Sequence, residues 1–364
     1  MIKNILAIRN DRFGEFLLII PALAALKESF PGAKITLTVN SYVRELAGCV
    51  ESADEVIVWE NKRHSLREVF KFSAKLKKRK FDLAVIFNPS KEAHLISFLA
   101  GVPKRVGYDR KWGILLTHKL KDTKYLGNRH EVDCNLELVG LVGARGQSPA
   151  GTVPDFHIKV DDNLTSVVHE DWGQSAMEVF RFAQDESPEI NSRRFRTVPS
   201  VALRLPHNDK YDFLAGAIAV HPFTSDPVKQ WPVERFRELA QRITREMKAK
   251  VVLVGKEDQK QQGTPCEAEC PLIVDLTNKT SLVELAQVLK QCRLLISCDS
   301  GPMHLSAAVG IPVVALFRND LPGKTAKRWG PWGAGHTVIE KSRLEDISVD
   351  EVFEKVKQGL PACR

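Results

Sequence analysis

The sequence lacks long apolar runs. No stretch of about 18 uninterrupted apolar residues occurs, so we expect no transmembrane helix. The opening MIKNILAIRNDRFG holds a short apolar run that Arg9, Asp11 and Arg12 interrupt, and it has no small-residue cleavage site, so we expect no signal peptide. Hydrophobic residues make up 43% and charged residues 27% of the 364 positions, which is typical of a soluble globular protein with room for two domains.

The common nucleotide-binding motifs are also missing. Neither a G-x-G-x-x-G fingerprint nor a P-loop sequence occurs, which argues against a dinucleotide dehydrogenase and against an NTPase. The chain has no Asp-x-Asp pair, which lowers the chance that a divalent metal bridges a diphosphate. We therefore predict a site that uses no metal and no cofactor.

Cysteines are scattered and odd in number. The seven are at positions 49, 134, 266, 270, 292, 298 and 363. A chain of this size does not need disulfides to fold, so the pattern indicates a reducing cytoplasm. Cys266 and Cys270 stand four apart, but no second Cys or His pair lies nearby at zinc-site spacing, and we expect a structural role for them.

Acidic residues are outnumbered by basic ones. The chain has 53 Lys and Arg against 45 Asp and Glu, a net charge of +8. This excess favours an anionic partner, which could be nucleic acid, a phosphorylated substrate or an anionic membrane surface. No basic signature with interleaved aromatic residues is present, so we expect no nucleic-acid partner. The cluster from Lys75 to Lys80 is interpreted as a solvated helix end, and a second cluster, Lys104 to Lys111, is predicted to follow a strand.

Strand-like and helix-like segments alternate in two series. Strands are predicted at Ile5–Ile8, Ile35–Val39, Val56–Val58 and Leu83–Phe87, and then at Ala217–Val220, Val251–Val254, Leu272–Leu276, Leu294–Ser297 and Val313–Phe317. Helices are predicted at Phe16–Phe30, with a kink or late start at Pro21, and at Leu66–Lys78, Ala93–Leu99, Glu131–Val142, Ser175–Ala183, Val233–Met247, Ser281–Lys290, Pro302–Val309 and Val349–Gln358.

The polar segment Gln184–Ser200 separates the two series. It gives an N-terminal domain over 1–183, a connection over 184–200 and a C-terminal domain over 201–364. The alternation predicts an α/β fold of two doubly wound Rossmann-like domains that face an interdomain cleft.

The stretch LLISCDSGPMHLSAAVGIPVVALF, Leu294 to Phe317, reads as strand, tight turn, helix and strand. In the turn, Asp299, Ser300 and Gly301 supply oxygens and backbone freedom for a helix N-cap, and Pro302 suits the first helical turn. Free backbone N–H groups from Ser300 to Met303 and the helix dipole would favour a phosphate there, and His304 could add a donor. The alternative is an ordinary helix cap beside a packed histidine.

A second candidate loop, HPFTSDPVKQWP, follows the strand Ala217–Val220. Thr224 and Ser225 offer hydroxyls and Lys229 offers a cation, which are the groups that a diphosphate leaving group needs. The alternative makes Lys229 a surface residue and Trp231 a packing anchor. After the strand Val251–Val254, Glu257 is a candidate partner for ribose hydroxyls.

With both loops in view, the sequence resembles glycosyltransferase family 9, the lipopolysaccharide heptosyltransferases. The similarity includes ILAIRNDRFGEFLLIIPALAALKESFPGAKI, FNPS, FLAGVPKRVGY, HEVD, HPFTSDPVKQWP, DSGPMHLSAAVGIPVVALF and RWGPWG. The resemblance implies a GT-B fold and metal-independent, inverting transfer of a heptose from ADP-heptose to the inner core of lipopolysaccharide. It implies a cytoplasmic enzyme that sits peripherally at the inner face of the inner membrane.

The resemblance also implies roles for particular residues. Lys229 and Thr224 would meet the diphosphate, Glu257 would hold the ribose, and the turn of Asp299, Ser300, Gly301 and His304 would hold diphosphate and sugar. Where the family usually has Asp after the glycine of the first loop, this chain has Glu15, which we prefer as general base over Asp11.

An acceptor that carries phosphates and Kdo carboxylates would contact basic side chains of the N-terminal half. The predicted acceptor-binding residues are Arg12, Lys91, Lys104, Arg105 and Arg110. Two rival interpretations remain open: a GT-B transferase that uses another nucleotide sugar, and a nucleotide-sugar-binding homologue that has lost catalysis.

Overall fold

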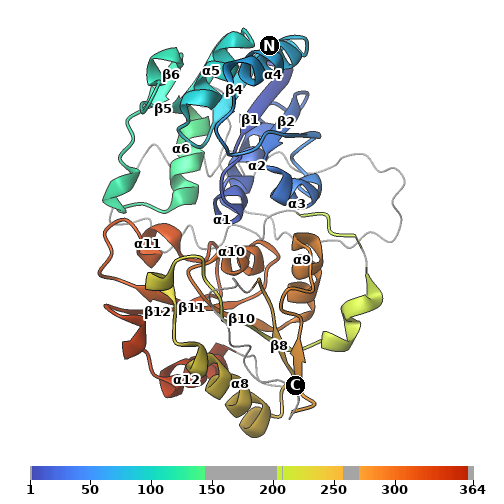
Figure 1. Cartoon of the computed structure of the whole chain (residues 1–364), viewed down its shortest axis with the longest axis vertical. Helices are drawn as coiled ribbons and strands as arrows, with labels where there is room; N and C mark the ends of the chain where they lie inside the picture. The colour runs from blue at the N-terminus through green and yellow to red at the C-terminus, as the bar shows by residue number, and fades with distance from the viewer. Residues whose placement is uncertain (1, 144–202, 207, 257–269, 360–364) are drawn as a thin grey trace, which may run out of the picture. The chain divides into compact units, whose positions relative to one another are not determined.

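The computed structural model describes residues 2–143, 203–206, 208–256 and 270–359, which form two compact units (Figure 1). The first unit holds the described residues up to Tyr125 and from Glu131 to Gly143. The second holds those from 203 onward together with the short segment Leu126–His130. The predicted connection over 184–200 and the predicted helix Ser175–Ala183 lie outside the described residues, so the domain boundary stays a prediction.

The first unit is built on one parallel sheet of six strands. They are β1 (Asn4–Ile8), β2 (Lys34–Val39), β3 (Glu55–Val58), β4 (Leu83–Ile86), β5 (Lys104–Tyr108) and β6 (His118–Leu120), in the order β3-β2-β1-β4-β5-β6. The helices between them are α1 (Phe13–Leu17), α2 (Ile20–Ser29), α3 (Arg44–Gly48), α4 (Leu66–Lys77), α5 (Lys91–Leu99) and α6 (Glu131–Gly143). Every pairing is parallel because a helix or a helix-containing crossover joins each strand to the next.

The first helical stretch is interrupted just before Pro21. The predicted helix over Phe16–Phe30 is two helices, α1 and α2, and Pro21 occupies the first turn of α2, where no N–H is needed. The predicted late start is therefore confirmed, while α1 begins earlier than expected, at Phe13. The basic cluster Lys104–Lys111 was expected to follow a strand; this is wrong for Lys104 and Arg105, which lie in β5, while Arg110 and Lys111 do follow that strand.

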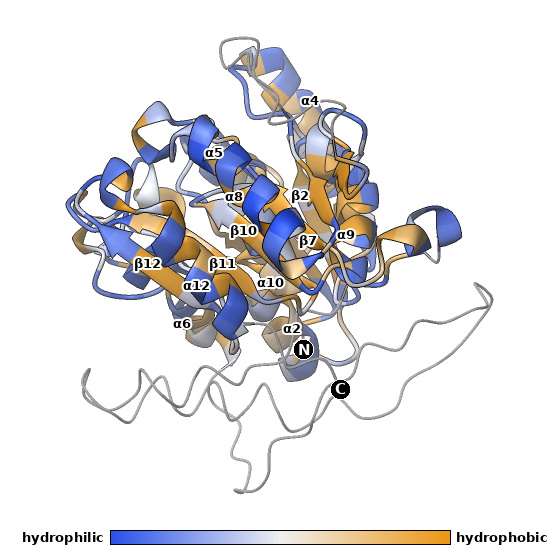
Figure 2. Cartoon of the chain, turned by 90° about the horizontal axis from the view of Figure 1, so that it is seen from below, coloured by the Kyte–Doolittle hydropathy of each residue, from blue (hydrophilic) through white to orange (hydrophobic). Residues whose placement is uncertain are grey.

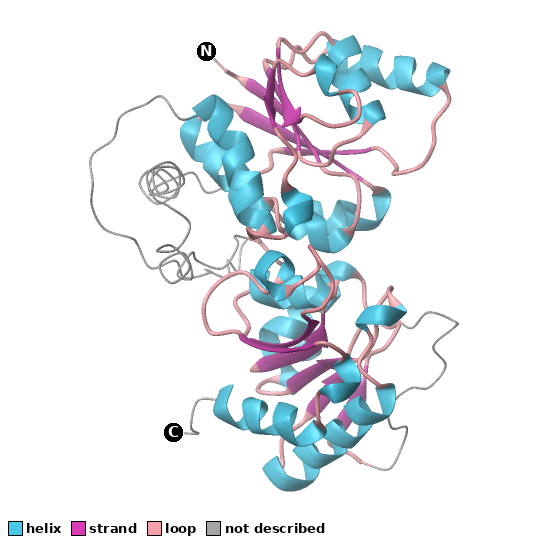
Figure 3. Ribbon diagram, turned by 90° about the vertical axis from the view of Figure 1, so that its left-hand side faces the viewer, coloured by secondary structure: helices cyan, strands magenta, loops and turns pink. Residues whose placement is uncertain are grey.

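The second unit repeats the same plan. Its strands are β7 (Ile218–His221), β8 (Val251–Leu253), β9 (Ile273–Asp275), β10 (Leu294–Cys298), β11 (Val313–Arg318) and β12 (Thr337–Lys341), all parallel, in the order β9-β8-β7-β10-β11-β12. Its helices are α8 (Val233–Met247), α9 (Leu282–Gln291), α10 (Gly301–Ala308), α11 (Ala326–Trp329) and α12 (Val349–Gly359). In each unit, ribbons of helix lie on the strands of the sheet (Figure 3).

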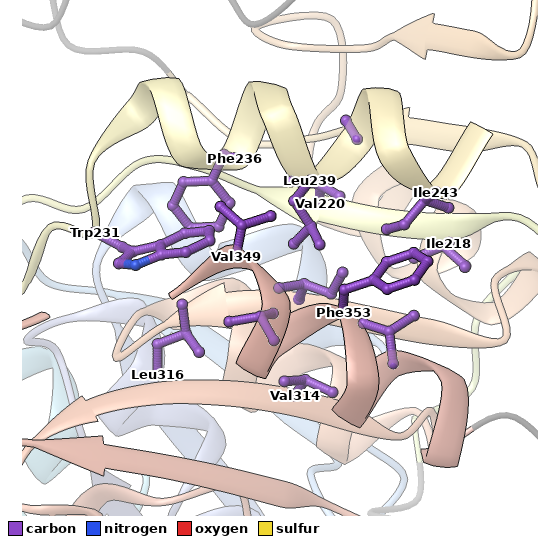
Figure 4. Close-up of a cluster of buried hydrophobic side chains, with 14 of the residues drawn as sticks. Ile218, Val220, Trp231, Phe236, Leu239, Ile243, Val314, Leu316, Val349 and Phe353 are labelled. Atoms are coloured by element: carbon purple, nitrogen blue, oxygen red, sulfur yellow. The ribbon is translucent and has the colours of Figure 1, made fainter. Parts of the chain in front are cut away.

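Buried apolar side chains hold α8 and α12 against the second sheet. Trp231 and Phe236 pack edge to face with ring centroids 4.7 Å apart, and Phe353 of α12 joins the same cluster (Figure 4). The indole N–H of Trp231 donates to the carbonyl of Ile347 at 3.0 Å, so the one polar atom of this buried ring is satisfied. Figure 2 shows the outer turns of α8 and α12 as hydrophilic and the strands as hydrophobic. The expected role of Trp231 as a packing anchor is confirmed.

Both sheets have the strand order of a doubly wound fold, and this order positions the candidate site. The order reverses between β1 and β4 in the first unit and between β7 and β10 in the second. Ligands of open α/β sheets bind outside the carboxyl ends of the strands at such a switch point. The loops to examine are therefore those that follow β1 and β4, and those that follow β7 and β10.

Candidate active site

The turn after β10 does not cap its helix as the sequence suggested. Ser300 is the N-cap residue of α10, but its side chain makes no capping hydrogen bond. Its hydroxyl lies 2.8 Å from the hydroxyl of Ser297 and 3.2 Å from Nδ1 of His221 instead. The prediction of a side-chain cap is wrong because these neighbouring strand residues compete for the hydroxyl. The amino end of α10 therefore presents its backbone N–H groups without a side-chain acceptor, which suits an anionic ligand.

The loops after β7 and β10 meet through an ion pair. Nζ of Lys229 bonds Oδ2 of Asp299, and both side chains are largely buried. Burial raises the pKa of Asp299, while the Lys229 ammonium opposes that rise. The ion pair confirms that these two loops lie together within the second unit, and their joint role in binding stays a prediction. Lys229 is not a free surface cation, because Asp299 fixes the direction of its ammonium group.

The two hydroxyl residues of the loop after β7, Thr224 and Ser225, differ in exposure. Thr224 is buried, and its hydroxyl donates to the carbonyl of Asp226 at 2.8 Å. Ser225 is exposed. The Asp226 carboxylate in turn caps the short turn Pro227–Lys229 by accepting from the N–H of Val228 at 3.2 Å. Thr224 and Asp226 therefore shape the loop that presents Lys229.

A neutral histidine supports the end of β7. Burial lowers the pKa of His221 to about 3, so its ring is uncharged at neutral pH. Gly255 follows β8 with φ of +117°, and a Cβ there would lie 2.6 Å from Nε2 of His221, so only glycine fits this close approach. Glu257, the predicted ribose partner, lies two residues further on and outside the described residues.

His304 lies one turn into α10 and is also buried. Burial first, and then the neighbouring His130 and Lys229, lower its pKa to about 3. Its Nδ1 has no hydrogen-bond partner among the described residues. A buried polar atom without a partner is costly, so this ring nitrogen is available to a ligand.

His130 is a site residue that the sequence analysis missed. Its Nε2 lies 3.0 Å from the carbonyl oxygen of Gly330, and its ring centroid lies 4.6 Å from that of Trp332. The segment Leu126–His130, which we call the strap, belongs to the second unit although the residues on either side belong to the first. HEVD and RWGPWG both carried the family resemblance, but no local pattern predicted that they meet.

In the first unit, the loop after β1 contains a buried charge network. Arg9 is almost fully buried; its Nε donates to Asp11 at 2.7 Å, and its Nη1 lies 3.7 Å from Glu131. Glu131 also pairs with Lys124 at 2.7 Å. Asp11 therefore already holds a buried guanidinium in a close ion pair, and that pair occupies its carboxylate.

Glu15 is differently placed. It lies in the first turn of α1, its side chain is 20% exposed, and its carboxylate lies 4.0 Å from the exposed guanidinium of Arg12. Burial raises the pKa of Glu15, while Arg9 opposes the rise. A carboxylate whose pKa is raised by burial suits a general base.

The predicted acceptor-binding cations divide between two edges of the first sheet. Lys91 opens α5 after β4, and Arg110 follows β5, so both lie at the carboxyl ends of the strands, as does Arg12. Lys104 pairs with Leu83 at the amino ends. Arg105 is next to it, and its Nε donates to the carbonyl of Leu115 at 2.6 Å. The structure therefore does not bring Lys104 and Arg105 to the edge that carries Glu15.

Two searches of the described residues gave no result. No group of three or more His, Cys, Asp or Glu side chains within them could hold a metal ion. None of their helices combines the length and the apolar character that crossing a bilayer requires.

Comparison with known proteins agrees with this arrangement. A putative glycosyltransferase of Haemophilus influenzae is 25% identical over 97% of this chain and 96% of its own length. Lipopolysaccharide heptosyltransferase 2 of Salmonella typhimurium is 23% identical over 88% of this chain and 84% of its own. The solved structure of the ADP-heptose LPS heptosyltransferase II of E. coli covers 98% of both chains with a TM-score of 0.68 at 18% identity, a similarity of fold. The sequence model described as glycosyltransferase family 9 (heptosyltransferase) matches residues 69–356, so this chain is a glycosyltransferase that belongs to family 9.

Proposed function

We propose that the protein transfers a heptose from ADP-heptose to the inner core of lipopolysaccharide, with inversion and without a metal. The observation that carries the proposal is the Lys229–Asp299 pair beside the uncapped amino end of α10, at the switch point of the second sheet. The family match and the names of the relatives, which include ADP-heptose and lipopolysaccharide heptosyltransferases, support the donor and the acceptor class.

On the donor side, the diphosphate accepts hydrogen bonds from the backbone N–H groups of Ser300, Gly301 and Met303, and Gly301 has no side chain to block its approach. Pro302 donates no hydrogen bond and starts the helix. Lys229 carries the positive charge that stabilises ADP as it leaves, and Asp299 holds its ammonium group in place. Thr224 and Ser225 line the same loop, and Glu257 takes the ribose.

Neutral His304 adds one hydrogen bond from an uncharged ring. His130 lies beside it and completes this side of the donor site through the strap. Because both rings are held by groups of the second unit, the donor side is assembled within one unit.

On the acceptor side, Glu15 takes the proton from an acceptor hydroxyl. The hydroxyl oxygen then forms a bond to the anomeric carbon as the bond from that carbon to the ADP oxygen breaks, so a single displacement inverts the configuration. Arg12, Lys91 and Arg110 contact the anionic groups of the acceptor near the carboxyl edge. The enzyme works peripherally at the cytoplasmic face of the inner membrane.

The test is mass spectrometry of the lipopolysaccharide core from cells that lack the protein. We expect a core truncated by a heptose and by everything attached beyond it, restored by the wild-type gene and not by Glu15→Gln. An intact core, or a truncation that begins at another sugar, would contradict the proposal.

A further inference from the structure

One face of the first sheet is covered by α4, α5 and the segment 109–117, and the outer surface of this layer is unusually apolar. Inward-facing residues of all three, among them Val69, Ile96 and Leu116, share one core cluster with β1 and β4. Of the twelve large hydrophobic side chains that are well exposed among the described residues, five lie on this layer. We call them the apolar face: Leu66, Phe70, Phe98, Trp112 and Ile114. Single exposed apolar side chains are ordinary, but a group on one layer indicates an interaction surface.

Contacts with Arg105 join α5 to the segment 109–117. The guanidinium carbon of Arg105 lies 5.4 Å from the ring centroid of Phe98, and its Nε donates to the carbonyl of Leu115, the neighbour of Ile114. Lys111 bonds the carbonyl of Pro89, just before α5. These contacts therefore connect α5, which carries Phe98, to the segment that carries Trp112 and Ile114.

The backbone of this segment is held in its turn, so the exposure is a built feature. The N–H groups of Leu115 and Leu116 donate to the carbonyls of Trp112 and Gly113, each at 3.0 Å, and close the short helical turn Gly113–Leu115. Ile114, the middle residue of this turn, is 88% exposed, the highest value of the twelve. An isoleucine held in water on an ordered turn gains nothing from folding alone.

Basic residues are frequent in α4 and in the stretch from β5 to the end of β6, which contains the segment 109–117. From Lys104 to Lys121 there are six Lys or Arg residues and one acidic residue, Asp109. The stretch Leu66 to Lys80, which contains α4, has seven basic residues and one acidic residue, Glu68. From the sequence we interpreted the end of this stretch, Lys75 to Lys80, as a solvated helix end. In the structure it lies at the end of α4, the helix that contains Leu66 and Phe70, so it adds positive charge to the layer that carries the apolar face.

We propose that the apolar face docks onto the surface of an anionic lipid bilayer. Apolar and aromatic side chains that enter the headgroup region, surrounded by Lys and Arg, are the features of proteins that lie on membranes without crossing them. Trp112 suits the interface, because its ring has an apolar body and a polar N–H. The inference rests on the proposed function in one respect: an acceptor anchored in lipid gives the enzyme a reason to bind there.

Charge favours lipid over a second copy of this chain. A symmetric dimer through the apolar face would bring two surfaces of the same sign together, whereas an anionic bilayer neutralises both basic stretches. Self-association is therefore the competing outcome that the test has to distinguish.

The test measures binding of the full-length protein to vesicles by co-sedimentation. Wild type is expected to bind vesicles that contain phosphatidylglycerol and to bind pure phosphatidylcholine vesicles weakly. Ile114→Glu and Phe98→Glu are each expected to weaken binding to the anionic vesicles about tenfold or more, because each removes an inserted apolar group and adds a repelled charge. Both are expected to keep wild-type turnover on an acceptor whose acyl chains have been removed.

Phe213→Glu is the matched control. Phe213 is an equally exposed aromatic with a lysine, Lys250, over its ring, but it belongs to the second unit. The proposal is overturned if Ile114→Glu and Phe213→Glu bind the anionic vesicles equally, or if Ile114→Glu only abolishes a dimer seen by sedimentation. Vesicle binding without heptose transfer would refute the proposed function and leave the membrane-docking inference standing. Heptose transfer without vesicle binding would refute the membrane-docking inference and leave the proposed function standing.

Discussion

At the scale of single residues, the two candidate carboxylates of the first unit differ in what surrounds them. Asp11 shares a buried guanidinium with Glu131, whereas burial raises the pKa of Glu15 and Arg9 and Arg12 oppose that rise. The raised pKa of Glu15 and the close ion pair of Asp11 favour Glu15 as the base, despite the longer side chain at this position.

Glu15→Gln is expected to lower kcat by about a hundredfold to ten-thousandfold, because the amide keeps the shape but takes no proton. Binding of ADP-heptose, measured by calorimetry, should be unchanged. Asp11→Asn is the matched control, and it should lose less activity. A larger loss in Asp11→Asn than in Glu15→Gln would reverse the assignment.

The pH dependence of kcat/KM should report the same carboxyl. The base acts when deprotonated, so the rate falls as pH drops through the pKa of Glu15. Burial raises that pKa, so the acid limb should lie above 4.5, the ordinary glutamate value. An acid limb below that value, or one that persists unchanged in Glu15→Gln, would contradict the assignment.

The two neutral histidines of the second unit should make stability depend on pH. Their pKa values are lowered to about 3 from an ordinary 6.5, so between these limits the unfolded chain binds more protons than the folded one. The free energy of unfolding should therefore fall as pH is lowered through this window, by up to about 1.4 kcal/mol per pH unit for each histidine. Urea titrations of His221→Gln and His304→Gln should show shallower slopes; slopes equal to that of wild type would refute the buried neutral state.

At the scale of elements, strong local patterns predicted the fold well. The helix Val233–Met247 has the bounds that its apolar spacing indicated, and Ser281 caps the next helix through a capping box with Glu284. Three strands were not predicted: β5, which begins with two basic residues, and the short, partly exposed edge strands β6 and β12. All three lack a clear apolar periodicity.

Contacts made across the chain account for what sequence reasoning missed in the site. Ser300 fits the sequence pattern of a cap, but its hydroxyl is taken by Ser297 and His221. Two loops at one switch point were expected to meet, and the ion pair between Lys229 and Asp299, 70 positions apart, follows from that topology. Nothing local to His130 indicates that its segment leaves one unit to join the other.

The conformation of the strap, Leu126–His130, should depend on Gly127. Gly127 has φ of +66°, and a Cβ there would lie 2.8 Å from Cα of Gly323. Gly127→Ala therefore adds a backbone clash to the strain of a left-handed alanine, which alone costs about 1–2 kcal/mol. We expect a raised KM for ADP-heptose, since His130 would be displaced.

Gly101→Ala provides the matched control for that variant. Gly101 has φ of +71° but nothing lies within 4 Å of its would-be Cβ, so it carries the backbone strain without the clash. It should lower the midpoint of thermal unfolding less than Gly127→Ala and leave the donor KM unchanged. Equal effects of the two substitutions on KM would remove the strap from the donor site.

At the scale of the whole molecule, the two units share one doubly wound strand order but carry different charged groups at their switch points. The first unit places a carboxylate of raised pKa there, and the second places a lysine–aspartate pair beside the open end of a helix. A transferase needs both kinds of site, because a proton has to leave the acceptor as negative charge develops on the departing diphosphate.

The most direct measurement is transfer in vitro, with ADP-heptose, a purified heptose-deficient lipopolysaccharide core and the full-length protein, followed by mass spectrometry of the core. The account predicts that wild type adds the mass of one heptose, and that Glu15→Gln binds the donor but leaves the core unchanged. It would be contradicted by a wild-type protein that binds ADP-heptose and adds nothing to the core, or by a Glu15→Gln variant that transfers at the wild-type rate.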